Sequence, residues 1–268
     1  MKVSELYNKH AGNDIYILGT GASARVFPSS FLDDKIVIGL NLAWQLRPVT
    51  YAITMRPDLN IPKFINWPEP VHTTWITKRD KLPPDSVAYG DSHFYYFETN
   101  GKKNSAPTGE PNNQGRMKEW VETATQDYLY LWSSISQSAI NLAANMGAKN
   151  IFLVGCDNCA IGGNHHAQKQ HTFWKGVSPD YRYHQYFEGL AEVRSGLNKR
   201  GVNLMSLTPF VGLSHIEEDF KKMCDEKGLL QYIENEDISW KMRDTRTLAK
   251  VRKWYRSVKS AIGAMRQV

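Results

Sequence analysis

The sequence predicts an α/β fold with a Rossmann-like, mostly parallel sheet and helices on both faces. Short apolar runs of strand length alternate with helix-period segments along the chain. The densest unit is Ser133 to Asp157, whose apolar residues recur every 3.6 residues up to Gly147 and then form a continuous run at Ile151 to Val154. A run that is apolar throughout is typical of a central strand covered on both faces.

The remaining elements follow the same alternation. An amphipathic helix is expected through Leu190, Val193 and Leu197, ending at Gly201. The segment 80–126 is polar and rich in Pro, Gly and Asn, so we expect a loop-rich, lid-like insertion there. Further strands are predicted from short β-rich runs at 14–18, 35–40, 51–55, 71–77 and 202–207.

The length and composition are those of an ordinary globular protein. The chain has 268 residues, of which 41% are hydrophobic and 22% charged, enough for one sizeable core. We expect a Rossmann-like domain at 1–235, which includes the insertion, and a tail at 236–268. The sequence has no apolar run of about 18 residues and no hydrophobic stretch at its start, so we expect a cytoplasmic protein without a transmembrane helix.

The tail is strongly basic. From Lys241 to Val268 there are nine Lys or Arg residues and one acid, whereas the whole chain has a net charge of +6. Apolar residues recur there at steps of three and four, which predicts a basic amphipathic helix. Such a helix can lie on an anionic membrane surface, or pack on the body or on a second copy of the chain. Nucleic acid is a less favoured partner, because a basic patch alone does not distinguish it.

Polar residues and glycines follow four of the predicted strands. Gly19-Thr20-Gly21 follows the first, and small residues there let a phosphate approach the backbone. Asn41 follows the second, where a dinucleotide fold would need an acid, so NAD is disfavoured. Asp157 follows the central strand, at the edge where open α/β sheets bind ligands. Arg56, after the third strand, either binds an anion or pairs with Asp58.

The histidines and cysteines do not complete a recognised metal site, and we interpret the CxxC spacing of Cys156 and Cys159 as a buried, structural Cys156 in preference to redox chemistry. His165 and His166 are adjacent and lack an HExxH partner, and Cys156 and Cys159 have no second CxxC to complete a zinc site. We therefore expect no metal. His184 stands among aromatic residues just before the predicted helix, with a pKa suited to proton transfer near neutral pH.

Taken in order, several motifs resemble those of the bacterial sialyltransferases of glycosyltransferase family 42. They also resemble a wider group that includes flagellin-modifying glycosyltransferases and 6-hydroxymethylpterin diphosphokinase-like proteins. The resemblance spans roughly residues 14–210. It is carried by IYILGTGASA, IGLNLAW, SSISQSAINLAANMGAKNIFLVGCD, YRYH and VNLMSLTP.

The resemblance implies a set of site residues. His184 falls on the family's general base, and His166-Ala167 resembles an HA motif of the flagellin-modifying relatives. Where the sialyltransferases hold the leaving phosphate with tyrosines, this chain has Cys159 and His165, and Arg56 stands near a family Asn. Cations at the positions of His165 and Arg56 would suit a more highly charged leaving group, such as a diphosphate. The residues at the family's cytidine-nucleotide-binding positions are Gly19, Thr20, Gly21, Asn41, Ser134, Ser136 and Asp157.

The resulting expectation is a metal-independent glycosyltransferase that moves a sugar, such as a nonulosonic acid, from a CMP-linked or other nucleotide-activated donor to a glycan hydroxyl. No cofactor beyond that donor is expected. Two alternatives remain open. One is a pyrophosphokinase of the pterin type, which needs ATP, Mg²⁺ and clustered carboxylates, for which Asp157 and Asp58 are the candidates. The other is a non-enzymatic nucleotide- or nucleic-acid-binding protein.

Overall fold

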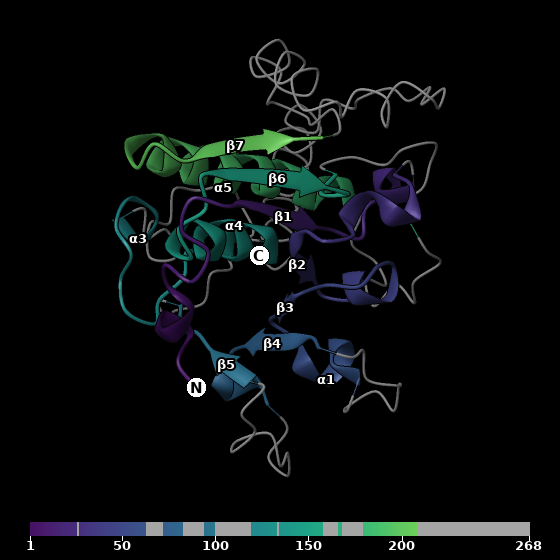
Figure 1. The fold of residues 1–268 in the computed structure, drawn as a ribbon, viewed down its shortest axis with the longest axis horizontal. Coiled ribbons are helices and arrows are strands. Elements are labelled where there is room, and N and C mark those ends of the chain that lie inside the picture. The colour runs from purple at the N-terminus through teal and green to yellow at the C-terminus, as the bar shows by residue number, and fades with distance from the viewer. Residues whose placement is uncertain are drawn as a thin grey trace, which may run out of the picture.

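The computed structural model describes residues 1–25, 27–62, 72–82, 94–99, 119–132, 134–157, 166–167 and 179–207, except for the side chains of 29, 179–185, 187 and 188. Seven parallel strands form one sheet in the order β5-β4-β3-β2-β1-β6-β7 (Figure 1). The predicted α/β fold with a parallel sheet is therefore confirmed. The strands are β1 (Asp14–Leu18), β2 (Ile36–Leu40), β3 (Tyr51–Thr54), β4 (Thr74–Thr77), β5 (Phe94–Tyr96), β6 (Asn150–Val154) and β7 (Asn203–Ser206).

Six of these strands lie where the apolar runs predict them, and β5 does not. β5 is three residues long and lies within the segment expected to be a loop-rich insertion. It forms the edge of the sheet, pairing with β4 through Trp75 and Phe94. The ring of Phe94 is 2% exposed and packs in the hydrophobic core at this edge of the sheet. A strand this short carries too little sequence pattern to be recognised.

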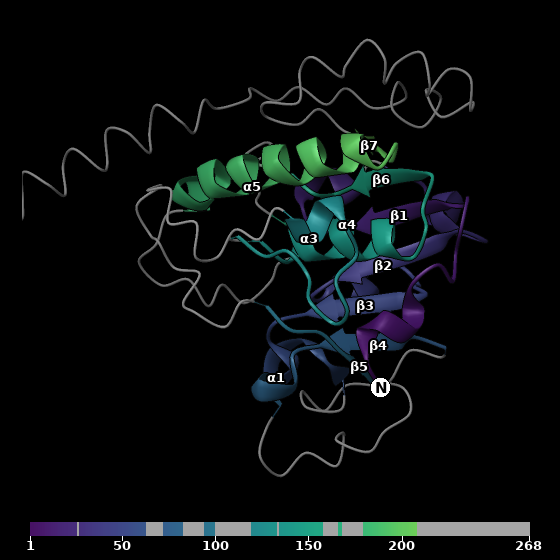
Figure 2. The same cartoon turned by 90° about the vertical axis from the view of Figure 1, so that its left-hand side faces the viewer.

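Helices cover one face of the sheet. They are α3 (Glu119–Glu122), α4 (Ile135–Asn145) and α5 (Pro179–Lys199), with α4 against the central strands and α5 packed on α4, α3 and β7 (Figure 2). Alternate strand residues such as Ile17 and Leu153 face this layer. The approach of α5 to α4 is close: a Cβ on Gly189 would lie 1.8 Å from Nε2 of Gln137.

The opposite face is covered, in the described residues, mainly by short 3-10 helices and the loops around them. Phe31 and Trp44 from these segments pack on Tyr16, Phe152 and their neighbours in the sheet. The segments include η2 (Ala22–Arg25), η3 (Ser29–Leu32) and η4 (Ala43–Gln45). The remaining short helices are η1 (Val3–Leu6), η5 (Arg79–Lys81) and α1 (Pro57–Asn60).

Helix α5 begins earlier than its apolar pattern indicates. The pattern starts near Leu190, but the helix begins at Pro179, a residue favoured in the first helical turn. His184 therefore lies inside α5 and not in a loop before a helix, which corrects the prediction. Because α5 leads through Gly201 directly into β7, it runs antiparallel to the strands. Its first turns consequently lie toward the edge at which the strands end.

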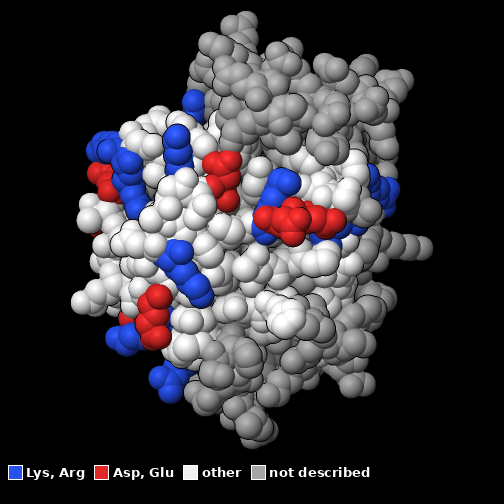
Figure 3. Space-filling model, in the orientation of Figure 1, with Lys and Arg blue, Asp and Glu red and all other residues white. Residues whose placement is uncertain are grey.

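The basic tail of Lys241 to Val268 lies outside the described residues, as does most of the 80–126 insertion. The described residues on the face shown in Figure 3 carry positive and negative side chains interspersed, with no large field of one sign. On this face, the described residues therefore show no concentration of one charge comparable to that of the tail.

Candidate functional site at the carboxyl edge of the sheet

The strand order reverses at β1, which lies between β2 and β6. In open α/β sheets, such a reversal leaves a crevice at the carboxyl ends of the two strands, and ligands bind there. The loops that leave β1 and β6 meet at this point. The N–H of Gly19 donates to the carbonyl of Val154 at 2.8 Å, and the N–H of Gly21 donates to the carbonyl of Gly155 at 2.8 Å.

The two loops approach so closely that glycine is required. A Cβ on Gly19 would lie 2.2 Å from the carbonyl oxygen of Gly155, and one on Gly21 would lie 2.6 Å from a carboxylate oxygen of Asp157. The sequence predicts these glycines for the approach of a phosphate. The structure also gives them a second role, the approach of the β6 loop itself.

Asp157 is fastened to the β1 loop by Ser23. The backbone N–H of Ser23 donates to one carboxylate oxygen at 2.9 Å, and the hydroxyl of Ser23 donates to the other. Burial raises the pKa of Asp157, and the two hydrogen bonds from Ser23 partly oppose this. The carboxylate is thus positioned as a hydrogen-bond acceptor at the point where the strand order reverses.

His166 lies beside the β1 loop. Its Nδ1 is 3.3 Å from the hydroxyl of Thr20, and the N–H of Ala167 donates to the carbonyl of Thr20 at 2.9 Å. The guanidinium of Arg25 donates to the carbonyl of Ala167. These contacts bring an imidazole from a segment far along the chain to the glycine-rich loop, next to the expected phosphate position.

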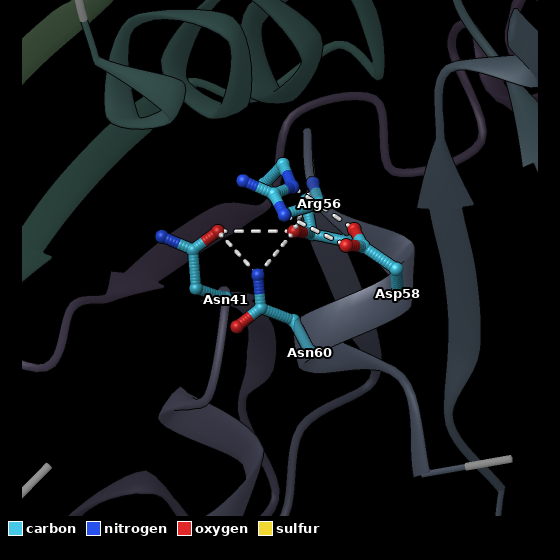
Figure 4. A network of polar contacts seen from close by, with 5 residues as sticks. Asn41, Arg56, Asp58 and Asn60 are labelled. Carbon is cyan, nitrogen blue, oxygen red and sulfur yellow. Dashed lines mark hydrogen bonds and ion pairs between the residues drawn. The ribbon is translucent and has the colours of Figure 1, made fainter. Parts of the chain in front are cut away.

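Asn41 belongs to a second polar group, at the ends of β2 and β3 (Figure 4). Its backbone is in the left-handed region, with φ of 53°, which Asn adopts more readily than most residues. Its Oδ1 accepts from the hydroxyl of Thr54 at 3.1 Å and from Nδ2 of Asn60 at 3.4 Å. Thr54 and Asn60 are buried, whereas Asn41 is partly exposed.

Arg56 and Asp58 form the ion pair that was one of the two predicted outcomes. The Nε and Nη2 atoms of Arg56 donate to the two carboxylate oxygens of Asp58 at 3.0 and 2.7 Å. The hydrogen bond from Arg56 lowers the pKa of Asp58. Because this carboxylate is already paired, it is a poorer candidate for the second metal ligand that a pyrophosphokinase would need.

Ser134 and Ser136 lie at the amino end of α4. Ser134 caps the helix, since its hydroxyl accepts from the N–H of Ser136 at 3.3 Å and forms a capping box with Gln137. The two serine hydroxyls are 2.7 Å apart. Because α4 precedes β6 in the same way that α5 precedes β7, its amino end lies toward the carboxyl edge of the sheet.

The remaining predicted residues are only partly described. His165 and Cys159 lie outside the described residues, and so does the side chain of His184, so their roles stay predictions. Cys156 is a free thiol whose Sγ lies 3.7 Å from the carbonyl of Ile17, and burial raises its pKa. A thiol of this kind is unreactive, which fits the structural interpretation of Cys156.

The described part of the chain contains no group of three or more His, Cys, Asp or Glu side chains arranged to hold a metal ion. Its helices include none long and apolar enough to cross a membrane.

Sequence reasoning missed Ser23, Thr54 and Asn60. Ser23 is the second small residue after the glycine-rich turn, and only the fold reveals that it meets Asp157. Thr54 carries a weak signal, because it is a hydroxyl residue at the last position of an apolar strand. Asn60 carries none, since α1 is a single turn with no periodic pattern.

Comparisons of the chain with models of known protein families, with curated proteins and with solved structures found no match.

Proposed function

We propose that the protein is a metal-independent glycosyltransferase, which transfers a sugar from a CMP-linked or other nucleotide-activated donor to a hydroxyl of a glycan. The observation that carries the proposal is the meeting of the glycine-rich β1 loop, Asp157 and His166 where the strand order reverses. This is the place in an open α/β sheet where nucleotides are bound.

In this proposal the donor lies across the carboxyl edge. The backbone of Gly19, Thr20 and Gly21 faces the phosphate, and the carboxylate of Asp157 accepts hydrogen bonds from the nucleoside. Further contacts to the donor come from Asn41, Ser134, Ser136, Arg56, His165 and His166. Positive charge from the guanidinium of Arg56, or from His165 when it is protonated, would stabilise the departing phosphate.

The reaction forms one bond and breaks another at the same carbon. The acceptor oxygen attacks the anomeric carbon of the sugar, while the bond from that carbon to the phosphate oxygen breaks and its electron pair leaves with the nucleotide. His184 takes the proton of the acceptor hydroxyl. A positioned general base of this kind contributes a factor of roughly 10²–10⁴ in rate.

The test combines binding with turnover. Calorimetric titration of the full chain with CMP, CDP, UDP, GDP, ATP and NAD should select one nucleotide, and the corresponding sugar donor should then be consumed in the presence of EDTA. His184→Ala should bind the nucleotide as the wild type does and lose transfer, whereas Ser195→Ala, an exposed position on α5, should change neither.

Two outcomes would contradict the proposal. Turnover that requires ATP and is abolished by EDTA would favour a pyrophosphokinase, and normal transfer by His184→Ala would rule out His184 as the general base.

We further propose that Lys241 to Val268 holds the enzyme at an anionic membrane. Deleting this tail should abolish binding to vesicles of phosphatidylglycerol while turnover on a soluble acceptor continues. A non-enzymatic binding protein would show no turnover in either form.

A further inference from the structure

The hydroxyl of Thr54 is the centre of a hydrogen-bond network at the ends of β2 and β3, and Figure 4 shows the surrounding Asn41, Asn60 and Arg56. It accepts from the backbone N–H of Arg56 at 2.9 Å and from Nδ2 of Asn60 at 2.8 Å. A hydroxyl has two acceptor sites and one proton. With both acceptor sites filled, the proton of Thr54 is donated to Oδ1 of Asn41, at 3.1 Å.

This network determines which end of the Asn41 amide is available to a ligand. Its Oδ1 receives two donors, Thr54 and Asn60, which fill the two lone pairs of the oxygen. Its nitrogen points away from Asn60 and Arg56 in Figure 4, and no described residue accepts from it. The partly exposed side of Asn41 therefore offers N–H donors and no acceptor.

The support beneath Asn41 is rigid. Thr54 is 2% exposed and Asn60 9%, and the indole of Trp44 donates to the backbone carbonyl of Asn60 at 2.8 Å. The backbone N–H of Asn41 donates to the carbonyl of Ile53 at 3.0 Å. The amide thus projects from a buried, hydrogen-bonded base, which lowers the entropic cost of binding a ligand there.

Arg56 adds a second set of donors at the end of the neighbouring strand. Its Nε and Nη2 atoms face Asp58, while its Nη1 is bonded to none of the described residues. The side chain of Arg56 is 58% exposed. Asn41 and Nη1 of Arg56 therefore offer only donors, which match the oxygen atoms of an anion, while the charge of Arg56 is shared with the paired carboxylate of Asp58.

We propose that Thr54 and Asn60 are positioning residues, which orient the amide of Asn41 so that it and Arg56 receive an oxygen of a phosphate or carboxylate group of the substrate. The identity of that substrate, a nucleotide-activated sugar, rests on the proposed function. The direction of the hydrogen bonds does not, because it follows from the orientations of the Asn41 and Asn60 amides in the structure.

The sharpest variant is Asn41→Asp. Asp also tolerates the left-handed backbone, and its inner oxygen still accepts from Thr54 and Asn60, so only the outward NH₂ is replaced by an oxygen. We expect the dissociation constant for CMP to rise on the order of 100-fold, and that for cytidine, which lacks the phosphate, to change less than about 3-fold. Asn198→Asp, the same change at an exposed position on α5, should affect neither ligand.

The positioning role is tested by Thr54→Val and Thr54→Ser. Valine removes the hydroxyl, so the amide of Asn41 loses its fixed orientation and the preference for CMP over cytidine should fall roughly 10-fold. Serine keeps the hydroxyl and should restore the preference, which a merely destabilised fold would not do. Titration with free sialic acid, which carries a carboxylate and no phosphate, distinguishes the two sources of the anion.

Equal losses of CMP and cytidine in Asn41→Asp, or no loss of either, would overturn the inference and leave the proposed function intact. If the wild type binds no nucleotide, the proposed function fails, and the inference is then decided with inorganic phosphate and sialic acid. In that case the NMR signals of the Asn41 side-chain amide should shift in the wild type and in Thr54→Ser, and not in Thr54→Val. Unchanged signals in the wild type would refute it.

Discussion

Ser23 holds the carboxylate of Asp157 by both oxygens, one with its backbone N–H at 2.9 Å and the other with its hydroxyl. The two residues are 134 positions apart in the chain. Their contact joins the loop after β1 to the loop after β6, where the strand order reverses.

Removal of the Ser23 hydroxyl should weaken the fold measurably. Ser23→Ala deletes a hydrogen bond to a buried carboxylate, and such bonds contribute about 1.5–3 kcal/mol. We expect the free energy of unfolding, measured with urea, to fall by about this amount. Ser195→Ala, at an exposed serine, should stay within about 0.5 kcal/mol of the wild type. Equal values for both variants would show that the contact contributes nothing.

Asp157 should make stability depend on pH in a direction opposite to that of a salt-bridged acid. Burial raises the pKa of Asp157 in the folded protein, whereas in the unfolded chain its pKa is about 4. Above about pH 4, the folded protein therefore retains a proton on Asp157 that the unfolded chain has lost. This contribution is complete below the unfolded pKa and is lost as the pH rises toward the folded pKa. Asp157→Asn stays uncharged and can keep both contacts with Ser23. Its unfolding free energy relative to the wild type should therefore increase from about pH 4 upward.

The same variant separates stability from binding. If Asp157 accepts hydrogen bonds from the nucleoside, Asp157→Asn should bind the nucleotide more weakly at neutral pH even though it unfolds no more easily. A flat difference in unfolding free energy between pH 4 and 8 would contradict the pKa shift.

Gly19→Ala should be far more damaging than Gly12→Ala. The added Cβ at position 19 would lie 2.2 Å from a backbone oxygen of Gly155, which can move only if the two loops separate. We expect a loss of about 3 kcal/mol or more. At Gly12 nothing lies within 4 Å, and only the positive φ of 78° opposes a side chain, at about 1–2 kcal/mol. Urea unfolding of both variants makes the comparison, and similar losses would argue against the close approach.

Ser134→Ala should cost about 1 kcal/mol, the usual contribution of a helix N-cap. Ser134→Asp keeps an acceptor for the N–H of Ser136 and should retain most of the stability. Hydrogen exchange of the first-turn amides of α4 provides the local measurement. If Ser134→Asp loses as much protection as Ser134→Ala, the cap does not stabilise this helix.

The strands could be predicted because burial on both faces leaves a simple pattern. Ile151 to Val154 is apolar throughout, and β6 follows it within one residue. Edge and surface elements give weaker patterns. β5 is stabilised by its pairing with β4, which no local sequence can indicate. The first turns of α5 are rich in tyrosine and charged residues, so the start of the helix at Pro179 was missed.

The candidate site was only half predictable for a related reason. Residues directly after a strand, such as Gly19, Asn41 and Asp157, could be placed at the carboxyl edge because parallel strands all end there. Their partners could not. Ser23 and Asn60 lie in short helices whose direction depends on packing. Thr54 cannot be distinguished in the sequence from the other residues of a β-rich strand.

The position of β6 beside β1 also has a consequence for biosynthesis. Asp14 pairs with Asn150, so during translation β1 has no partner on one side until more than half of the chain has left the ribosome. An unpaired strand edge of this kind promotes association with other chains. Fragments that end before residue 150 should therefore aggregate, and chaperone binding to the nascent chain should decline once β6 emerges.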